Sequence, residues 1–136
     1  MEKVCSHSLL SQIISGDPVR PHINAEERLA PSRDVYHLDH KAYICLAYLN
    51  YVPYDEKSLL SMQCGPIVVA YTIWSNEKGK GRELILKTRE LIKTQDRFER
   101  LVTLSPQTEM AMKFHLSNGA ELIQENSNSN NFEYEL

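Results

Sequence analysis

The spacing of apolar residues changes several times along the chain, and each change predicts a different element. Near the N-terminus two apolar pairs, Leu9–Leu10 and Ile13–Ile14, recur at the spacing of one helix face, and a glycine and a proline follow them. A second short helix is predicted from Asn24, because asparagine favours the position just before a helix. We therefore expect residues 1–40 to form a helical N-terminal part.

Longer apolar runs in the middle of the chain predict strands. Residues 41–51 are rich in aromatic and β-favouring side chains, and residues 58–63 give a second strand candidate that could pair with them as a hairpin. Residues 67–74 form a nearly continuous apolar run, which is typical of a strand buried on both faces. This part of the sequence is therefore expected to contain the centre of a sheet.

The second half of the chain alternates between helix and strand patterns. The predicted order is an amphipathic helix, a strand, a helix and two strands, over residues 82–99, 100–105, 107–119, 120–126 and 130–136. Met110 and Phe114 are expected on the inner side of the second helix, and Gly119 at its C-terminal end. The whole order predicts one α/β (α+β) domain over residues 1–136, with residues 41–136 forming a mixed sheet flanked by helices.

Composition narrows the class of protein. The chain has 136 residues, 42% of them apolar, and a net charge of −3, which argues against a nucleic-acid-binding protein. No run reaches the roughly 18 apolar residues of a membrane span, and the N-terminus does not have the pattern of a signal peptide. Three cysteines without C-x-x-C spacing suggest free thiols and a cytoplasmic location, with Cys45 and Cys64 expected in the core.

A glycine-bearing loop lies between the buried strand and the amphipathic helix. In N-E-K-G-K-G, residues 76–81, the two glycines let backbone N–H groups approach an anion at the start of a helix, where the helix dipole is positive. Three cationic side chains add formal charge: Lys78, Lys80 and Arg82. These features predict a pyrophosphate site. The alternative is an ordinary strand–helix turn with solvated lysines.

This strand, loop and helix resemble the GNAT superfamily of N-acetyltransferases, whose [Q/R]-x-x-G-x-[G/A] loop binds the pyrophosphate of coenzyme A. Gly79 and Gly81 match the two glycine positions, and Asn76 occupies the Gln/Arg position. The resemblance implies a mostly antiparallel sheet and a coenzyme A contact from the loop. Its candidate binding residues are Asn76, Lys78, Gly79, Lys80, Gly81 and Arg82.

Three further runs resemble the catalytic domain of malonyl-CoA decarboxylase, a GNAT-fold enzyme. They are T-L-S-P at residues 103–106, F-H-L-S-N-G-A at residues 114–120 and N-F-E-Y at residues 131–134. The resemblance implies that Ser105 contacts the departing carboxylate or the thioester oxygen, and that His115 transfers a proton. Tyr134 is the third candidate catalytic residue.

Simpler explanations exist for each of these three residues. Ser105 could cap the following helix, His115 could be an interior histidine, and Tyr134 could pack on an edge strand. A histidine with a pKa near ~6.5 could donate a proton at neutral pH. Whether Ser105 and His115 face one cleft depends on the phase of the intervening helix, which the sequence leaves open.

The expected function is that of an enzyme acting on a coenzyme A thioester, acetyl-CoA or malonyl-CoA, by decarboxylation. The alternatives are a GNAT acyltransferase that uses an amine or thiol acceptor, and a non-catalytic module that binds coenzyme A. No metal is expected, because the pair of histidines at 37 and 40 with Asp39 lacks further ligands. The partner is expected to be a small acyl-CoA, without nucleic acid or membrane, and a homodimer is left open.

Overall fold

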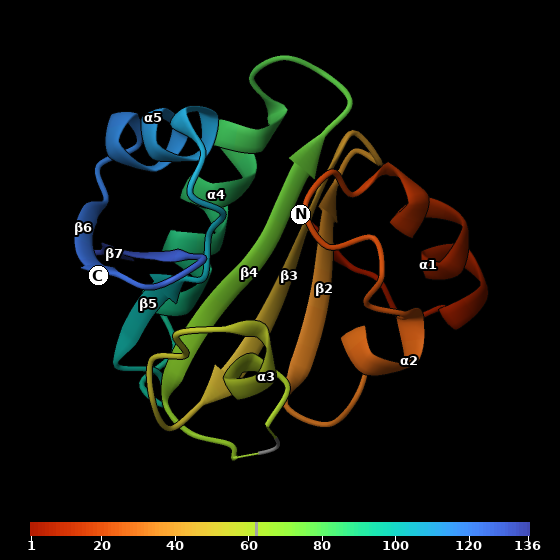
Figure 1. The fold of residues 1–136 in the computed structure, drawn as a ribbon. Coiled ribbons are helices and arrows are strands. Elements are labelled where there is room, and N and C mark those ends of the chain that lie inside the picture. Colours follow the sequence, from red (N-terminus) through yellow and green to blue (C-terminus); the bar gives the residue numbers. More distant parts are fainter. Residues whose placement is uncertain (62) are drawn as a thin grey trace.

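The chain folds into one seven-stranded sheet with helices on both faces (Figure 1). The computed structural model describes residues 1–61 and 63–136. The strands are β1 (Glu2–Lys3), β2 (Arg33–Leu38), β3 (Ala42–Leu49), β4 (Ile67–Ser75), β5 (Arg100–Thr103), β6 (Glu121–Glu125) and β7 (Asn130–Tyr134). The helices are α1 (His7–Ile13), the 3-10 turn η1 (Ile14–Gly16), α2 (Ala25–Arg28), α3 (Glu56–Leu59), α4 (Lys80–Lys93) and α5 (Glu109–Ser117).

The strand order is β1-β2-β3-β4-β5-β7-β6, and every neighbouring pair is antiparallel except β4 and β5. The parallel pairing covers only four residues of each strand, from Ile67 opposite Arg100 to Ala70 opposite Thr103. Beyond Ala70, β4 continues to Ser75 beside β3 alone. The prediction of a mixed, mostly antiparallel sheet is confirmed. In the described chain, the only parallel pair of the sheet, β4 and β5, separates beyond Ala70.

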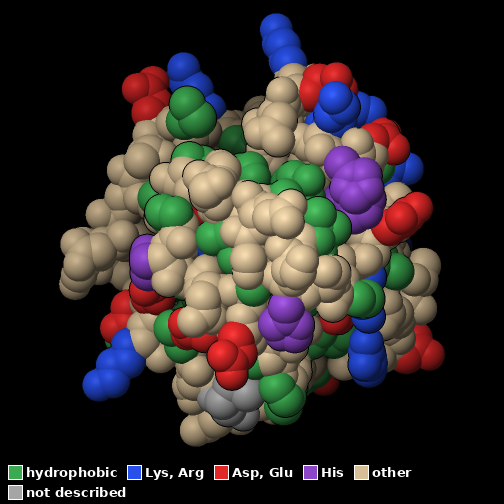
Figure 2. Space-filling model, turned by 90° about the vertical axis from the view of Figure 1, so that its right-hand side faces the viewer, with side chains coloured by type: hydrophobic (Ala, Val, Ile, Leu, Met, Phe, Trp, Pro, Cys, Tyr) green, Lys and Arg blue, Asp and Glu red, His purple; other side chains and the backbone are tan. Residues whose placement is uncertain are grey.

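Two buried apolar clusters lie on the two faces of the sheet. One packs beneath α1 and α2, and the other packs beneath α4 (Figure 1). Ser6 caps α1 and Asn24 caps α2, each accepting a hydrogen bond from a first-turn N–H, as the sequence predicts for Asn24. Figure 2 views the α1 side of the molecule, where charged side chains lie mostly toward the margins.

Two predictions about elements are wrong. Residues 1–40 are not only helical, because Arg33–Leu38 form β2. Two of the buried positions of this strand hold polar residues, Arg33 and His37, so the sequence shows no clear apolar face. The strand expected at residues 58–63 is partly replaced by α3, which ends at Leu59. Asp55 and Ser58 form a reciprocal capping box that favours a helical turn there. Residue 62 of that prediction lies outside the described residues.

Three finer predictions also need correction. The amphipathic helix begins at Lys80 and ends at Lys93, earlier than expected. Met110 is not packed in the core: it is 83% exposed and lines the cavity described below, whereas Phe114 is half-buried. Cys64 is exposed, and only Cys45 is a core thiol. Among the described residues, none of the helices combines the length and apolar character that crossing a membrane requires.

Candidate functional site

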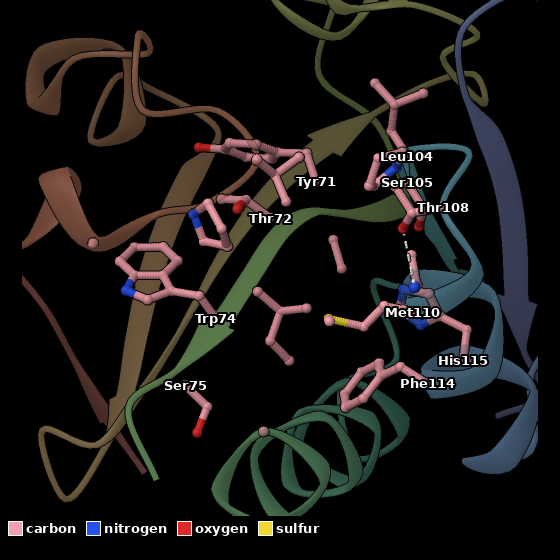
Figure 3. A pocket seen from close by; sticks show the side chains of 18 residues that line it. Tyr71, Thr72, Trp74, Ser75, Leu104, Ser105, Thr108, Met110, Phe114 and His115 are labelled. Carbon is pink, nitrogen blue, oxygen red and sulfur yellow. Dashed lines mark hydrogen bonds between the residues drawn. The ribbon is translucent and has the colours of Figure 1, made fainter. Parts of the chain in front are cut away.

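A cleft opens where β4 and β5 separate, with a cavity of about 490 Å³. Side chains of β4 form one wall, and the segment from Leu104 into α5 forms the opposite wall (Figure 3). The loop at Gly16–Val19 closes part of the cleft. Ser105, His115 and Gly81 all line this one cavity, so the intervening helix does bring the predicted serine and histidine to one cleft.

The β4 wall is formed by Tyr71–Ser75, the part of β4 that has no partner strand on the β5 side. The register with β3 shifts at this point, because Cys45 pairs with Thr72 and Leu46 pairs with Ala70. Tyr71 is therefore the extra residue of a β-bulge, a feature that often re-aims side chains beside functional sites.

Ser105 lies just beyond the end of β5. Its backbone N–H donates to the carbonyl of Asn130 over 2.8 Å, and its carbonyl accepts from the N–H of Asn130 over 2.9 Å. Its hydroxyl lies 2.8 Å from the hydroxyl of Thr103, which itself accepts from the N–H of Phe132. Ser105 does not cap α5, because Thr108 does so. When Thr103 donates to Ser105, the serine O–H is free to donate into the cleft.

His115 lies in the last turn of α5, and the way that helix ends fixes its position. The N–H of Ala120 donates to the carbonyl of His115, and Gly119, with a φ of 97°, donates to Leu116. These two bonds form a Schellman motif, which confirms the predicted role of Gly119 at the helix end. The His115 ring packs 5.0 Å from the Phe132 ring.

The hydroxyl of Tyr134 lies 2.7 Å from Nδ1 of His115. Tyr134 is buried on β7, an inner strand, so the expectation of edge-strand packing is wrong. Among the described residues, this nitrogen is the only hydrogen-bond partner of the Tyr134 hydroxyl. A buried hydroxyl needs an acceptor for its proton, so the geometry favours Tyr134 donating to Nδ1. The neutral imidazole then carries its own proton on Nε2.

Burial lowers the pKa of His115 to about 4. The imidazole is therefore neutral at pH 7, which corrects the expectation of a titration near neutrality. Burial also raises the pKa of Tyr134 far above its ordinary value, so its hydroxyl keeps its proton. The pair presents a neutral N–H donor rather than an imidazolium.

The glycine loop leads directly into the N-terminus of α4. Gly79 has a φ of 86° and precedes the first residue of the helix, so its conformation favours glycine. A Cβ at Gly81 would lie 3.6 Å from both Phe114 and Ser75, an ordinary contact at the cleft wall. The first N–H groups of a 14-residue helix have no partner within the helix, and they lie at this loop.

The charged residues of the loop differ in their availability. The ammonium of Lys80 lies 3.1 Å from Asp39 and 3.5 Å from Glu83, so carboxylates already neutralise it. Lys78 and Arg82 are exposed, as is Asn76, whose backbone N–H donates to the carbonyl of Lys41. Of the predicted anion-binding side chains, Lys78 and Arg82 are the ones that stay free of ion pairs within the described chain.

The lining of the cavity is largely apolar. The side chains that line it include no Lys, Arg, Asp or Glu in the described chain. Ser105 and His115 are therefore polar groups in a largely apolar lining, where the hydrogen bonds that they donate act more strongly on developing charge than in bulk water. No group of three or more potential metal ligands occurs among residues 1–61 and 63–136.

Sequence reasoning missed part of this site. The sequence predicts Tyr71 and Trp74 only as residues of a buried strand, yet they form a wall of the cleft. The sequence predicts Gly16 only as the end of the first helix and predicts no role for Val19, yet both line the cavity. The separation of β4 from β5 depends on strand pairing between distant segments, for which the local pattern carries no signal.

No family model and no curated protein matches the chain. Solved structures do resemble it. A proposed acetyltransferase of the GNAT family from Desulfovibrio desulfuricans superposes with a TM-score of 0.68 and 11% identity, covering 98% of this chain and 96% of that one. An acetyltransferase from Thermus thermophilus gives a TM-score of 0.56 and 15% identity, covering 79% and 67%.

Malonyl-CoA decarboxylase from Agrobacterium vitis superposes with a TM-score of 0.62 and 20% identity, covering 77% of this chain and 32% of that one. The chain thus spans about a third of the length of that decarboxylase. These identities are low, so the likeness concerns the fold. The chain has a GNAT-like fold that resembles the malonyl-CoA decarboxylase structures.

Proposed function

We propose that this chain binds an acyl-CoA thioester in the cleft between β4 and β5 and decarboxylates it, as a malonyl-CoA decarboxylase does. The observation that carries the proposal is that one cavity reaches from Gly81, at the start of α4, to Ser105 and His115. A ligand with an anionic end and a reactive thioester end matches that arrangement.

In this proposal the pyrophosphate contacts the N–H groups of Gly81 and Arg82 at the start of α4, with the side chains of Lys78 and Arg82 nearby. The N–H of Lys80 already donates to the carbonyl of Glu77. The pantetheine arm lies along the unpaired part of β4, whose backbone can hydrogen-bond with its amides. The acyl end then lies between Ser105 and His115.

The chemical step breaks the bond between the carboxylate carbon and the α-carbon. The electron pair moves onto the thioester oxygen as an enolate, and CO2 leaves. The Nε2–H of His115 donates a hydrogen bond to that oxygen, and the Ser105 hydroxyl donates to the departing carboxylate or to the same oxygen. The α-carbon then takes the proton from Nε2 as solvent in the cleft returns a proton to the same nitrogen. The ring stays neutral, and Tyr134 keeps its proton and its hydrogen bond to Nδ1.

The state of His115 favours decarboxylation over acyl transfer. Transfer to an amine needs a base whose pKa lies near the working pH, whereas His115 has a pKa of about 4 and its Nδ1 is held by Tyr134. Decarboxylation needs no base, because the carboxylate itself supplies the electrons. An apolar cavity also disfavours the charged carboxylate relative to neutral CO2.

A second cavity supports acyl transfer as the alternative function. It measures about 510 Å³ and shares Val19, Leu104 and Pro106 with the first cavity, so an acceptor there would approach the thioester end. Its lining includes His22, whose Nε2 lies 2.7 Å from a carboxylate oxygen of Glu56. A histidine oriented by a carboxylate is a usual general base.

The test is release of CO2 from malonyl-CoA by the purified chain. The proposal predicts turnover without an acceptor, and a loss of about 10²- to 10³-fold in His115→Gln. Loss of turnover in His22→Gln together with a requirement for an amine would instead support the transferase. Thermal stabilisation by coenzyme A without turnover of either thioester would support the non-catalytic module.

A further inference from the structure

A buried ion pair lies directly behind the β4 wall of the cleft. The guanidinium of Arg28 on α2 lies 2.9 Å from a carboxylate oxygen of Asp17, and both side chains are fully buried. Arg28 also donates to the backbone carbonyls of Arg20 and Ile23, over 2.6 and 2.8 Å. This pair therefore fixes the loop that follows α1, which closes part of the cleft.

The other carboxylate oxygen of Asp17 connects this loop to β4. It accepts hydrogen bonds from the N–H groups of Val19 and Arg20, at 2.8 and 3.1 Å, and from the hydroxyl of Thr72 at 2.9 Å. Thr72 lies in the part of β4 that has no partner strand on the β5 side.

Two neighbours of Thr72 are held from the same side. The guanidinium of Arg20 donates to the backbone carbonyl of Tyr71, the bulge residue. The guanidinium of Arg28 lies 5.8 Å from the ring centre of Trp74. Gly16 is also close to that indole, since a Cβ at Gly16 would lie 3.4 Å from its Nε1. Three residues of the cleft wall are thus held by one charged network.

A strand that lacks a neighbour on one side loses half of its ladder hydrogen bonds and the rigidity that they provide. The network supplies other contacts to that segment. We propose that Asp17, Arg20 and Arg28 are positioning residues that hold Tyr71–Trp74 in the conformation that receives the thioester arm. The ligand part of this inference rests on the proposed function, whereas the ordering of the segment does not.

Four variants separate this role from a general contribution to folding. Thr72→Val keeps the shape of the side chain and removes the hydroxyl that donates a hydrogen bond to Asp17. Thr72→Ser keeps that hydroxyl. Arg20→Met removes the contact with Tyr71, and Arg20 is not among the residues that line the first cavity. Thr88→Val is the matched control, because Thr88 is a buried threonine on α4 whose hydroxyl bonds within its own helix.

The experiment measures binding of acetyl-CoA by calorimetry, and hydrogen exchange of the free protein across β4. We expect Thr72→Val and Arg20→Met to weaken binding roughly tenfold, as the loss of one charge-assisted hydrogen bond predicts. Amide exchange should rise at residues 71–75 and stay unchanged at residues 67–70. Thr72→Ser and Thr88→Val should behave like the wild type in both measurements.

Two results would overturn the inference. One is unchanged exchange at residues 71–75 in both Thr72→Val and Arg20→Met. The other is an equal loss of binding in Thr88→Val, which would show a general effect of buried threonine hydroxyls. If the wild type binds neither acetyl-CoA nor malonyl-CoA, the proposed function fails, while the exchange data still decide whether the network orders β4.

Discussion

The two halves of β4 differ in their surroundings, although one apolar run in the sequence extends through both. Ile67–Ala70 pair with β3 on one side and with β5 on the other. Thr72–Ser75 pair with β3 alone, and together with the bulge residue Tyr71 they line the cleft on their free side. The first half is held by strand ladders, and the second is held by side chains from the loop after α1.

This difference shows how a fold can place a binding surface in the middle of a sheet. Backbone groups in the first half are satisfied by neighbouring strands, so they have no capacity for a ligand. In the second half the missing strand leaves both space and hydrogen-bonding capacity, and the charged network limits the disorder that would follow. Variants behind, opposite and just after the second half of β4 test this difference.

The largest effect is expected from Asp17→Asn, which breaks the buried ion pair behind the second half. Removing one partner leaves the Arg28 guanidinium buried without its counter-charge, at a cost of about 3–5 kcal/mol in the free energy of unfolding. Urea denaturation measures this loss. The control is Glu133→Gln, at the partly exposed pair with Arg100 beside the first half, where a loss below about 1 kcal/mol is expected. Equal losses in both variants would contradict the comparison.

The next effect concerns pH, through His115 on the wall opposite the second half. Burial lowers its pKa to about 4 from 6.5, so between these pH values the unfolded chain binds a proton and the folded chain does not. Stability should therefore fall as pH falls from 6.5 to 4, by up to about 3 kcal/mol from this group. In His115→Gln the decrease over this range should be smaller by that amount. The difference between the two pH profiles of unfolding is the measurement, and parallel profiles would show that the imidazole titrates normally.

The smallest effect concerns the turn that follows the second half. Gly79→Ala places a Cβ on a residue with a φ of 86°, which should cost about 1–2 kcal/mol. Gly81→Ala introduces only ordinary contacts with Phe114 and Ser75 and should change stability by less than about 0.5 kcal/mol. Melting temperatures of the two variants provide the test. A larger loss for Gly81→Ala than for Gly79→Ala would reject this view of the loop.

Local patterns predicted much of the fold because they have local physical causes. The apolar run of β4, the Asn24 cap and the glycine that ends α5 act within a few residues, and the structure confirms them. The pattern failed at β2, where polar residues interrupt the apolar face, and at α3, where a capping box outweighed the apolar residues. At both places the sequence contains local features that favour different structures with similar strength.

The site was predicted only in part because its geometry depends on distant pairings. The sequence singled out Ser105, His115 and Tyr134, and the fold brings Tyr134 to 2.7 Å from His115. It gave no sign of the lowered pKa of His115, since burial arises from elements that meet only in the folded chain. The contact between Asp17 and Thr72 joins positions 55 residues apart, beyond the reach of any local pattern.

The most direct test of the account is a titration of the isotopically labelled chain with malonyl-CoA and with coenzyme A, followed by amide chemical shifts. The account predicts perturbations at residues 71–75, at residues 79–82 and at Ser105, with residues 67–70 nearly unchanged. Only malonyl-CoA should be consumed during the experiment, yielding acetyl-CoA. Shifts confined to other surfaces, or no shifts with either ligand, would contradict the claim that the unpaired half of β4 receives a thioester.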